Sequence, residues 1–273
     1  MILVDGRRQE TVSIQDRALH YGDGLFETLA VRDSVPLAWD LHRARLSTSC
    51  ARLGFHQPDD GVLLDEVRQV STGQEKTVVK VILSRGEGGR GYSPGPEAVH
   101  TRIVAAYPWP DYPAQYNDEG IVSAISKTRL GHNPALAGIK HLNRLEQVLV
   151  AQEVAGSGLP EMVVLDIADA ITEGGKSNIF LVKNEVLYTP KLELAGVEGV
   201  IRKAILDQAS EIKLETRVEK LGVDALYGAD EIFFCNSIIG LWPVKMLDDR
   251  KFNIGPVCQL LRKTLVSTNM IHN

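Results

Sequence analysis

Lys140 stands directly before a segment with helical apolar spacing, in which Leu142, Leu145, Val148 and Leu149 recur. The positive end of a helix dipole disfavours the ammonium form of a lysine, and burial disfavours it further. Both effects favour the free amine, which forms Schiff bases with aldehydes. Because an ordinary surface lysine gives the same pattern, Lys140 is a candidate nucleophile only if other residues complete a site.

Two further segments carry groups that such a lysine would need. Residues 172–178, Thr-Glu-Gly-Gly-Lys-Ser-Asn, run from a turn into a strand. The Glu173 carboxylate could hold a proton on a heteroaromatic nitrogen, or it could simply cap that turn. Residues 198–202 form a loop-to-helix junction, where the amides of Val200 and Ile201 have no partner within the helix. Such amides bind phosphate well, although every helix start has them.

Two polar side chains could complete a phosphate site. Ser237 follows a predicted buried strand at residues 231–235 and could donate a hydrogen bond to phosphate. Arg45 has apolar spacing from Leu41 and Leu53 on a predicted helix, so it could point inward, although an exposed arginine is commoner. A lysine nucleophile, an acid for a ring nitrogen and a phosphate site are together the requirements of pyridoxal 5'-phosphate.

The glycine-rich segment 86–91 has the letters of a dinucleotide-binding pattern and follows a predicted strand. The next residues, Tyr-Ser-Pro-Gly-Pro, cannot open a helix, so the pyrophosphate site of that pattern is missing. A loop remains that carries Arg90 and Tyr92, whose guanidinium and phenol could bind a carboxylate. An ordinary hairpin loop is the alternative.

The composition narrows the class of protein. The 273 residues are 44% hydrophobic and 24% charged, as in a soluble globular protein. A net charge of -5 argues against a nucleic-acid or membrane-surface partner, and no apolar run approaches the ~18 residues of a membrane span. Scattered cysteines at positions 50, 235 and 258 and scattered histidines show neither a disulfide framework nor metal-ligand spacing. We therefore expect a cytoplasmic protein without a metal.

Alternating strand and helix signals predict two α/β lobes of unequal size. Three prolines between residues 108 and 113 indicate a linker, so we expect a smaller domain at residues 1–110, a linker at 111–117 and a larger domain at 118–273. The predicted strands are residues 2–4, 11–14, 26–32, 77–84, 101–107, 121–125, 162–166, 179–182 and 231–235. The predicted helices are residues 40–53, with Asp40 as N-cap, 59–70, 141–155, 200–210 and 256–267.

The chain resembles the fold-type IV pyridoxal-phosphate enzymes along nearly its whole length, a family that includes D-amino acid and branched-chain aminotransferases. The matching stretches are Asp16-Arg-Ala, Gly22-Asp-Gly, His42-Arg-Ala-Arg-Leu, residues 84–93, Gly138-Ile-Lys-His-Leu-Asn-Arg-Leu-Glu-Gln, Thr172-Glu, Ser177-Asn-Ile-Phe, Thr189-Pro and Gly196-Val-Glu-Gly-Val-Ile-Arg.

The resemblance implies a role for each candidate residue. Lys140 would form the covalent link to pyridoxal 5'-phosphate, and Glu173 would face its pyridine nitrogen. The remaining cofactor-binding residues would be Arg45, Asn178, Val200, Ile201 and Ser237, the first and the last three of them at the phosphate. The substrate-binding residues would be Thr28, Arg90, Tyr92 and Asn236. The family is homodimeric, so a second copy of the chain is the expected partner.

Within this family the chain is most similar to the 4-amino-4-deoxychorismate lyases, which release 4-aminobenzoate and pyruvate in folate biosynthesis. Branched-chain aminotransferases have a tyrosine five residues after the lysine, where this chain has Leu145. Phe26 stands where D-amino acid aminotransferases carry a tyrosine. An aminotransferase on the same scaffold is the alternative, and a binding protein that has lost the cofactor is a more distant one.

Overall fold

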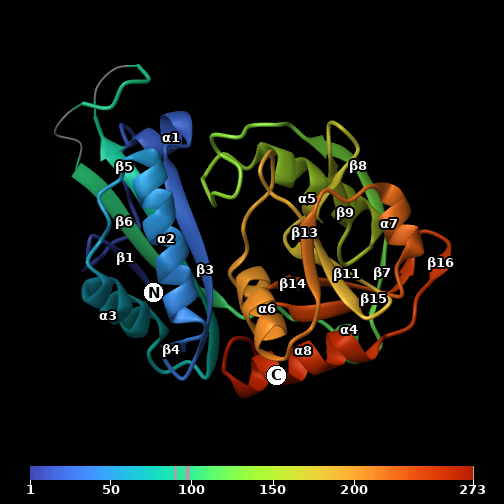
Figure 1. The fold of residues 1–273 in the computed structure, drawn as a ribbon. Coiled ribbons are helices and arrows are strands. Elements are labelled where there is room, and N and C mark those ends of the chain that lie inside the picture. The colour runs from blue at the N-terminus through green and yellow to red at the C-terminus, as the bar shows by residue number, and fades with distance from the viewer. Residues whose placement is uncertain (89–90, 96–98, 273) are drawn as a thin grey trace. The chain divides into compact units, whose positions relative to one another are not determined.

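The computed structural model describes residues 1–88, 91–95 and 99–272, and the chain divides into two compact units (Figure 1). Unit 1 comprises Met1–Pro110 and Lys140–Asn143, and unit 2 comprises Asp111–Ile139 and Arg144–Asn273. The sequence predicted two domains that follow one another along the chain. It did not predict that Lys140–Asn143 belongs to unit 1. Residues 111–117, expected as a linker, belong to unit 2 and contain the start of helix α4 (Gln115–Asp118).

Unit 1 is built on one sheet of six antiparallel strands in the order β2-β1-β6-β5-β3-β4. The strands are β1 (Ile2–Val4), β2 (Arg7–Arg8), β3 (Gly24–Arg32), β4 (Val35–Pro36), β5 (Lys76–Glu87) and β6 (Val99–Pro108). Short helix α1 (Arg17–Tyr21) packs on β5, while α2 (Trp39–Leu53) packs on β3 and α3 (Asp60–Ser71) on β6 (Figure 1). In the middle of β5 buried residues alternate with half-buried ones, so one face of the sheet carries the core of unit 1.

The sequence predicted both long helices of unit 1 because their end signals are local. Helix α2 ends at Gly54 in the left-handed conformation (φ 65°), and the Asp59 side chain caps α3 by accepting from the Val62 amide at 2.9 Å. The N-cap prediction for α2 was wrong, because Ala38 is the N-cap and Asp40 lies in the first turn. The strand predicted at residues 11–14 was also wrong, since the structure assigns no strand to these described residues.

Unit 2 contains a three-stranded sheet, β10-β9-β8, and a larger sheet, β13-β12-β11-β14-β15-β16, with β7 paired in parallel to β15. The strands of the small sheet are β8 (Ile125–Leu130), β9 (Val163–Asp166) and β10 (Ile171–Gly174). Those of the larger sheet are β7 (Ile121–Ser123), β11 (Asn178–Lys183), β12 (Val186–Pro190), β13 (Thr216–Glu219), β14 (Glu231–Asn236), β15 (Gly240–Leu247) and β16 (Arg250–Lys251). Besides α4, the helices are α5 (Leu145–Ser157), α6 (Val200–Glu211), α7 (Val223–Gly228) and α8 (Pro256–Ser267).

The core of unit 2 lies on the larger sheet, where α6 and α8 pack on β14. Phe234 and Trp242 are buried side by side in this core, on paired positions of β14 and β15. The buried Glu231 carboxylate accepts hydrogen bonds from the amides of Val257 (3.1 Å) and Cys258 (2.9 Å) in the first turn of α8. Because these amides have no partner within the helix, the carboxylate fixes the start of α8 on the sheet.

Helix α5 differs most from the expectation. It begins at Leu145 rather than at residue 141, and Val150 is its one fully buried residue. Leu145, Val148 and Leu149, whose spacing predicted a buried face, are 79%, 48% and 51% exposed. The apolar pattern therefore marks a surface of this chain and not part of its core.

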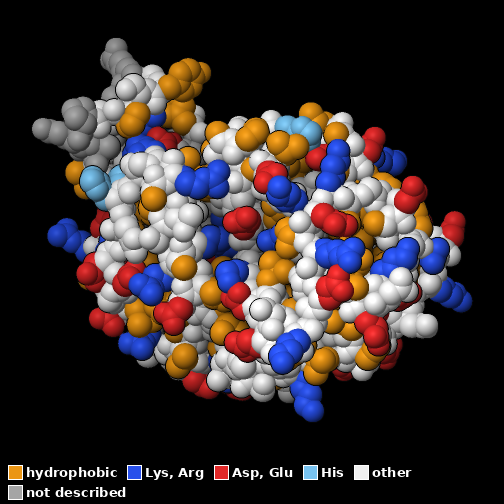
Figure 2. All heavy atoms as spheres, viewed as in Figure 1, with side chains coloured by type: hydrophobic (Ala, Val, Ile, Leu, Met, Phe, Trp, Pro, Cys, Tyr) orange, Lys and Arg blue, Asp and Glu red, His pale blue; other side chains and the backbone are white. Residues whose placement is uncertain are grey.

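The surface carries charges of both signs. On the face shown in Figure 2, acidic and basic side chains are interspersed. Among the described residues, no helix has the length and apolar character that crossing a membrane requires.

Substitution of Gly255 tests how closely the start of α8 packs against the Glu231 side chain. A Cβ atom at Gly255 would lie 1.9 Å from Cδ of Glu231, so we expect Gly255→Ala to lower the free energy of unfolding by about 1–3 kcal/mol. Gly156→Ala in α5 is the control, because a Cβ there meets nothing within 4 Å and should stabilise the helix by about 0.5–1 kcal/mol. Urea denaturation of both variants measures the difference, and equal stabilities would contradict the close packing.

Candidate active site

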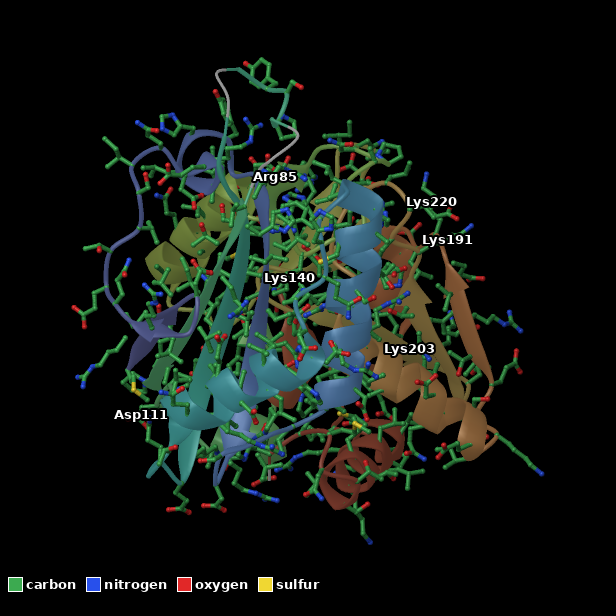
Figure 3. All side chains as sticks on the ribbon, turned by 90° about the vertical axis from the view of Figure 1, so that its left-hand side faces the viewer. Arg85, Asp111, Lys140, Lys191, Lys203 and Lys220 are labelled. Atoms are coloured by element: carbon green, nitrogen blue, oxygen red, sulfur yellow. The ribbon has the colours of Figure 1, made fainter. Side chains whose placement is uncertain are left out.

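Lys140 lies beside the start of β3, in a segment that makes one isolated antiparallel bridge with that strand, between Leu25 and His141 (Figure 3). The Phe26 amide donates to the Lys140 carbonyl at 3.0 Å, and the Leu142 amide donates to the Gly24 carbonyl at 3.0 Å. Lys140 is thus in an extended segment, five residues before α5 begins. The predicted position at a helix mouth was wrong, and because the effect of a helix dipole fades beyond the first turn, the α5 dipole does not favour the free amine of Lys140.

Two glycines let this segment approach β3. A Cβ at Gly24 would lie 2.5 Å from Cδ1 of Leu142, and one at Gly22 (φ 62°) would lie 2.6 Å from Oδ1 of Asn143. Asn143 also donates to the Gly22 carbonyl at 3.0 Å. The Gly22-Asp-Gly24 stretch therefore provides the surface on which the lysine segment lies.

The Lys140 side chain lies against Phe26, with Nζ 4.4 Å from the ring centre. Nζ of Lys80 lies 5.0 Å from the same ring, and Lys80 is the β5 partner of Thr28 on β3. Sequence reasoning missed Lys80, although a lysine within a β-branched strand is an unusual choice that could have drawn notice. Two ammonium groups beside one ring make this part of unit 1 suited to an anionic molecule.

Arg45 lies on α2 and pairs with Glu27 of β3, which is buried. Nε of Arg45 donates to Glu27 at 2.8 Å, its Nη2 donates to the second oxygen, and Nδ1 of His42 lies 2.7 Å from the carboxylate. Burial alone would raise the pKa of Glu27, but the Arg45 charge and the hydrogen bonds from His42 and Arg45 lower it from 4.5 to about 2. Burial lowers the pKa of His42, so neutral His42 donates to an ionised Glu27.

Arg17 holds the segment that carries Tyr92. Its buried guanidinium donates to the carbonyls of Gly91 (3.0 Å) and Tyr92 (2.7 Å) and to the Asp23 carboxylate (2.9 Å). The Tyr92 ring is 88% exposed and packs edge-on against Tyr21. Figure 3 shows Arg85 at the end of the sheet from which this segment leaves. Arg90, the other predicted substrate residue here, lies outside the described residues.

In unit 2, Glu173 is a buried residue of β10. Its Oε2 accepts from the Val197 amide at 2.8 Å, and its Oε1 accepts from Nε2 of Gln147 at 3.5 Å. A Cβ at Gly196 (φ 85°) would lie 3.1 Å from Oε2, so only a glycine lets the chain pass over the carboxylate. Gln147, on α5, is a second residue that sequence reasoning missed, because its contact depends on the packing of α5.

The start of α6 fits a phosphate group. Val200 and Ile201 are 3% and 1% exposed, and within the described chain no side chain caps the Gly199 end of this helix. Its first amides have no partner within the helix and are shielded from bulk water, so they suit an anion. Asn178 donates to the Val197 carbonyl at 2.8 Å, and a Cβ at Gly199 would lie 1.9 Å from Asn178 Oδ1. Asn178 therefore shapes the approach to α6.

Asn236 and Ser237 lie at the end of β14, as the sequence predicted. Asn236 Oδ1 accepts from the amides of Ile238 and Ile239 at 2.8 Å each, and Nδ2 donates to the Lys176 carbonyl at 2.9 Å. The Asn236 side chain therefore fixes the turn that contains Ser237 and ties it to the segment between Glu173 and Asn178.

The structure thus places Lys140, Arg45 and Thr28 in unit 1 around β3, and Tyr92 on the segment beyond β5. In unit 2 the Glu173 and Asn178 side chains both bind the backbone of Val197, which precedes α6, and Asn236 binds the Lys176 carbonyl and fixes the turn that contains Ser237. An amine, a buried carboxylate and buried helix-start amides are the groups that a phosphorylated aldehyde with a ring nitrogen requires.

Residues 24–247 match the family model of the class IV aminotransferases, and the chain belongs to this family. Enzymes of the family depend on pyridoxal 5'-phosphate, so membership confirms both the fold-type IV architecture and the cofactor that the sequence indicates.

Individual relatives are similar over nearly the whole chain. An aminodeoxychorismate lyase from Vibrio harveyi is 33% identical over 264 residues, which cover 96% of this chain and 97% of the relative. The crystal structure of 4-amino-4-deoxychorismate lyase from Pseudomonas aeruginosa is 39% identical, with a TM-score of 0.94 over 99% of this chain and 100% of that one. A branched-chain-amino-acid aminotransferase from Escherichia coli K12 is 31% identical over 266 residues, covering 92% of this chain and 86% of the relative.

The Glu27 pair gives a pH-dependent prediction. Because folding lowers the pKa of Glu27 to about 2, its ionised form stabilises the fold fully above pH 4.5, and this stabilisation is lost as the pH falls towards 2. We expect Glu27→Gln to lower the free energy of unfolding by about 3–5 kcal/mol at pH 7, and the deficit to shrink below pH 4.5. Urea denaturation at several pH values measures it.

The control is Asp65→Asn, which removes a carboxylate that is 81% exposed beside Arg68 and should leave the stability nearly unchanged. A deficit for Glu27→Gln that stays constant down to pH 2 would contradict the buried ion pair.

Proposed function

We propose that the protein is a pyridoxal-phosphate-dependent lyase that converts 4-amino-4-deoxychorismate to 4-aminobenzoate and pyruvate. The observation that carries the proposal is that a chain with a fixed Lys140 matches two proteins named as this lyase over at least 96% of its length. Their identities, 33% and 39%, exceed the 31% of the aminotransferase from Escherichia coli K12.

We assign the cofactor-binding roles as follows. The Lys140 amine binds the aldehyde carbon, the Glu173 carboxylate holds a proton on the pyridine nitrogen, and the buried amides of Val200 and Ile201 bind the phosphate. Arg45, Asn178 and Ser237 complete the cofactor-binding set. When bound, the cofactor supplies an electron sink for the bond-breaking step.

Proton transfer falls to Lys140. With the substrate held at the cofactor, the Lys140 amine would take the proton from C4 of the substrate. Cleavage of the ether bond between the ring and the enolpyruvyl group would make the ring aromatic, and Lys140 would return the proton to the methylene carbon of the departing enolpyruvate, which gives pyruvate. Thr28, Asn236 and the segment with Arg90 and Tyr92 contact the substrate in this proposal, and Lys80 adds positive charge beside Thr28 for a substrate with carboxylates.

An aminotransferase on the same scaffold is the second candidate, because the aminotransferase from Escherichia coli K12 is 31% identical over 92% of this chain. The two candidates share the cofactor residues and differ in the fate of the substrate. Leu145 argues against a branched-chain aminotransferase, because those enzymes have a tyrosine at this position. Leu145 is 79% exposed.

Substitution of Lys140 tests the central role. We expect Lys140→Ala to lose the visible absorbance of the bound cofactor and to release 4-aminobenzoate at least about 10³-fold more slowly, since it removes both the covalent link and the acid–base group. The control is Lys76→Ala, because Lys76 also lies over an aromatic ring, 4.2 Å from that of Trp109. An active, coloured Lys140→Ala protein would overturn the assignment.

The products separate the two candidates. The purified protein is given aminodeoxychorismate alone, and separately D-alanine or leucine with 2-oxoglutarate. Release of 4-aminobenzoate and pyruvate from the first mixture supports the lyase. Glutamate from the second mixture, with no 4-aminobenzoate from the first, would identify an aminotransferase instead.

We also propose that the protein forms a homodimer, supported by the apolar surface of α5. Leu145 lies one helical turn before Val148 and Leu149, and the three side chains are 79%, 48% and 51% exposed. An exposed cluster of this kind marks an interaction surface more often than single exposed residues do. A closed homodimer is the commonest assembly that such a surface serves.

Light scattering after size exclusion tests this, with twice the 30.0 kDa chain mass expected for the native protein. We expect the double substitution Leu145→Glu and Leu149→Glu to yield the monomer mass, because it places two charges in the apolar surface. The control is Val62→Glu on α3, a single exposed valine that should leave the mass unchanged. A monomeric native protein would rule the homodimer out.

A further inference from the structure

Glu161 is a buried carboxylate to which none of the roles above assigns a function. It lies two residues before β9 and is 1% exposed. Its Oε1 accepts from the amides of Gly175 (2.8 Å) and Met162 (3.0 Å), and its Oε2 accepts from Ser177 Oγ (2.8 Å) and the Lys176 amide (3.3 Å). Three of these four donors belong to the turn at residues 174–177, between β10 and β11.

That turn is tightly confined. The Gly174 amide donates to the Ser177 carbonyl at 2.6 Å, which closes the turn. A Cβ at Gly174 would lie 2.2 Å from Ser177 Oγ, and one at Gly175 would lie 2.8 Å from Val150 and 3.0 Å from the Glu161 carboxylate. The carboxylate therefore fills the space inside the turn and determines where its backbone runs.

The candidate cofactor residues of unit 2 lie around this turn. Glu173 precedes it and Asn178 follows it, and the two side chains bind the amide and the carbonyl of Val197 at 2.8 Å each. Val197 leads through Gly199 into α6, so the helix-start amides depend on the same contacts. The Lys176 carbonyl, within the turn, accepts from Asn236 at 2.9 Å.

We propose that Glu161 is a positioning residue for the cofactor, which holds the 174–177 turn so that the Glu173 carboxylate and the α6 amides keep their places. This inference rests on the cofactor roles proposed above and would hold for a lyase or an aminotransferase. Glu161 acts through the turn and does not itself contact the cofactor.

The electrostatics of Glu161 argue against a purely stabilising role. Burial raises its pKa, and the hydrogen bonds from Ser177, Met162 and Gly175 only partly oppose this. Ionisation of a carboxyl group whose pKa rises on folding lowers the stability of the fold relative to the protonated form. The role of Glu161 is therefore to fix the geometry of the 174–177 turn.

Cofactor affinity provides the test. Glu161→Gln keeps the size of the side chain but replaces one acceptor oxygen with an NH2 group. This group would face the amides and the hydroxyl that now donate to the carboxylate. Outer groups that orient the ligands of a metal change its affinity by about 10–100-fold, and we expect Glu161→Gln to raise the Kd for pyridoxal 5'-phosphate by about tenfold or more. Absorbance titration of the cofactor-free full-length protein measures the Kd, and thermal melting of the same sample reports its folding.

Glu231→Gln is the matched control. Glu231 is also buried in unit 2 and also accepts from two amides, but it caps α8 and its hydrogen bonds reach none of the candidate cofactor residues. We expect Glu231→Gln to lower the melting temperature while its Kd stays within about twofold of the native value, whereas folded Glu161→Gln should have a raised Kd even when the two variants lose similar stability. The absorbance maximum of the bound cofactor should shift in Glu161→Gln as in Glu173→Gln, and not in Glu231→Gln.

The outcomes separate the two proposals. A native protein that binds no pyridoxal 5'-phosphate would remove the proposed function. A native protein that binds it, with unchanged Kd and absorbance in folded Glu161→Gln, would overturn the role of Glu161 alone. If Glu161→Gln does not fold, Ser177→Ala removes one of the four hydrogen bonds and should raise the Kd by about threefold, whereas an unchanged Kd in that variant would also overturn the role.

Discussion

Two backbone hydrogen bonds between the lysine segment and β3 determine the rest of the candidate site in unit 1. They join Phe26 to Lys140 and Leu142 to Gly24, and they tie the lysine segment to the start of β3 through an isolated bridge. A side chain on a backbone segment held in this way has a fixed origin, which an amine needs if it is to meet a bound aldehyde repeatedly. The same pairing delays the start of α5 to Leu145, and it accounts for the glycines that face the segment from the start of β3.

The two buried carboxylates show how the same side chain is used in opposite ways. Glu27 faces a guanidinium, so its pKa falls and its charge is part of what holds α2 on the sheet. Glu161 accepts hydrogen bonds from amides and a hydroxyl, and burial outweighs these bonds and the Lys176 charge, so its pKa rises. A cation that is hydrogen-bonded to the carboxylate compensates its desolvation more effectively than amide and hydroxyl dipoles do.

The sequence predicted those parts of the fold that local signals determine. The β-branched run at residues 77–84 became β5, and the helices predicted at residues 40–53 and 59–70 became α2 and α3, whose boundaries Gly54 and Asp59 set. The errors arose where distant segments decide the outcome. Residues 140–142 have a helical pattern but pair with β3. Leu145 is apolar but exposed, because apolar character alone does not distinguish a buried position from a surface one.

Within the candidate site, too, the sequence indicates residues that have a local signal and misses those that depend on distant contacts. Glu173, Asn178 and the start of α6 could be singled out because a glycine, a turn or a helix start accompanies each of them in the sequence. Gln147 and Glu161 could not, since each depends on packing that brings it to a distant partner, and the sequence marks Lys80 only as an unusual residue in a β-branched strand. Glu27 looks like an ordinary polar residue of an alternating strand, and only the β3 register shows that it faces the core.

The short segment at residues 140–143 also has an evolutionary consequence. The chain enters unit 1 a second time only to deliver these four residues, and both flanking segments belong to unit 2. A gene fragment that ended near residue 110 would encode the N-terminal sheet without Lys140 and with the start of β3 unpaired along one edge. Exchange of that fragment alone between genes would therefore pair the sheet with a lysine segment from another chain.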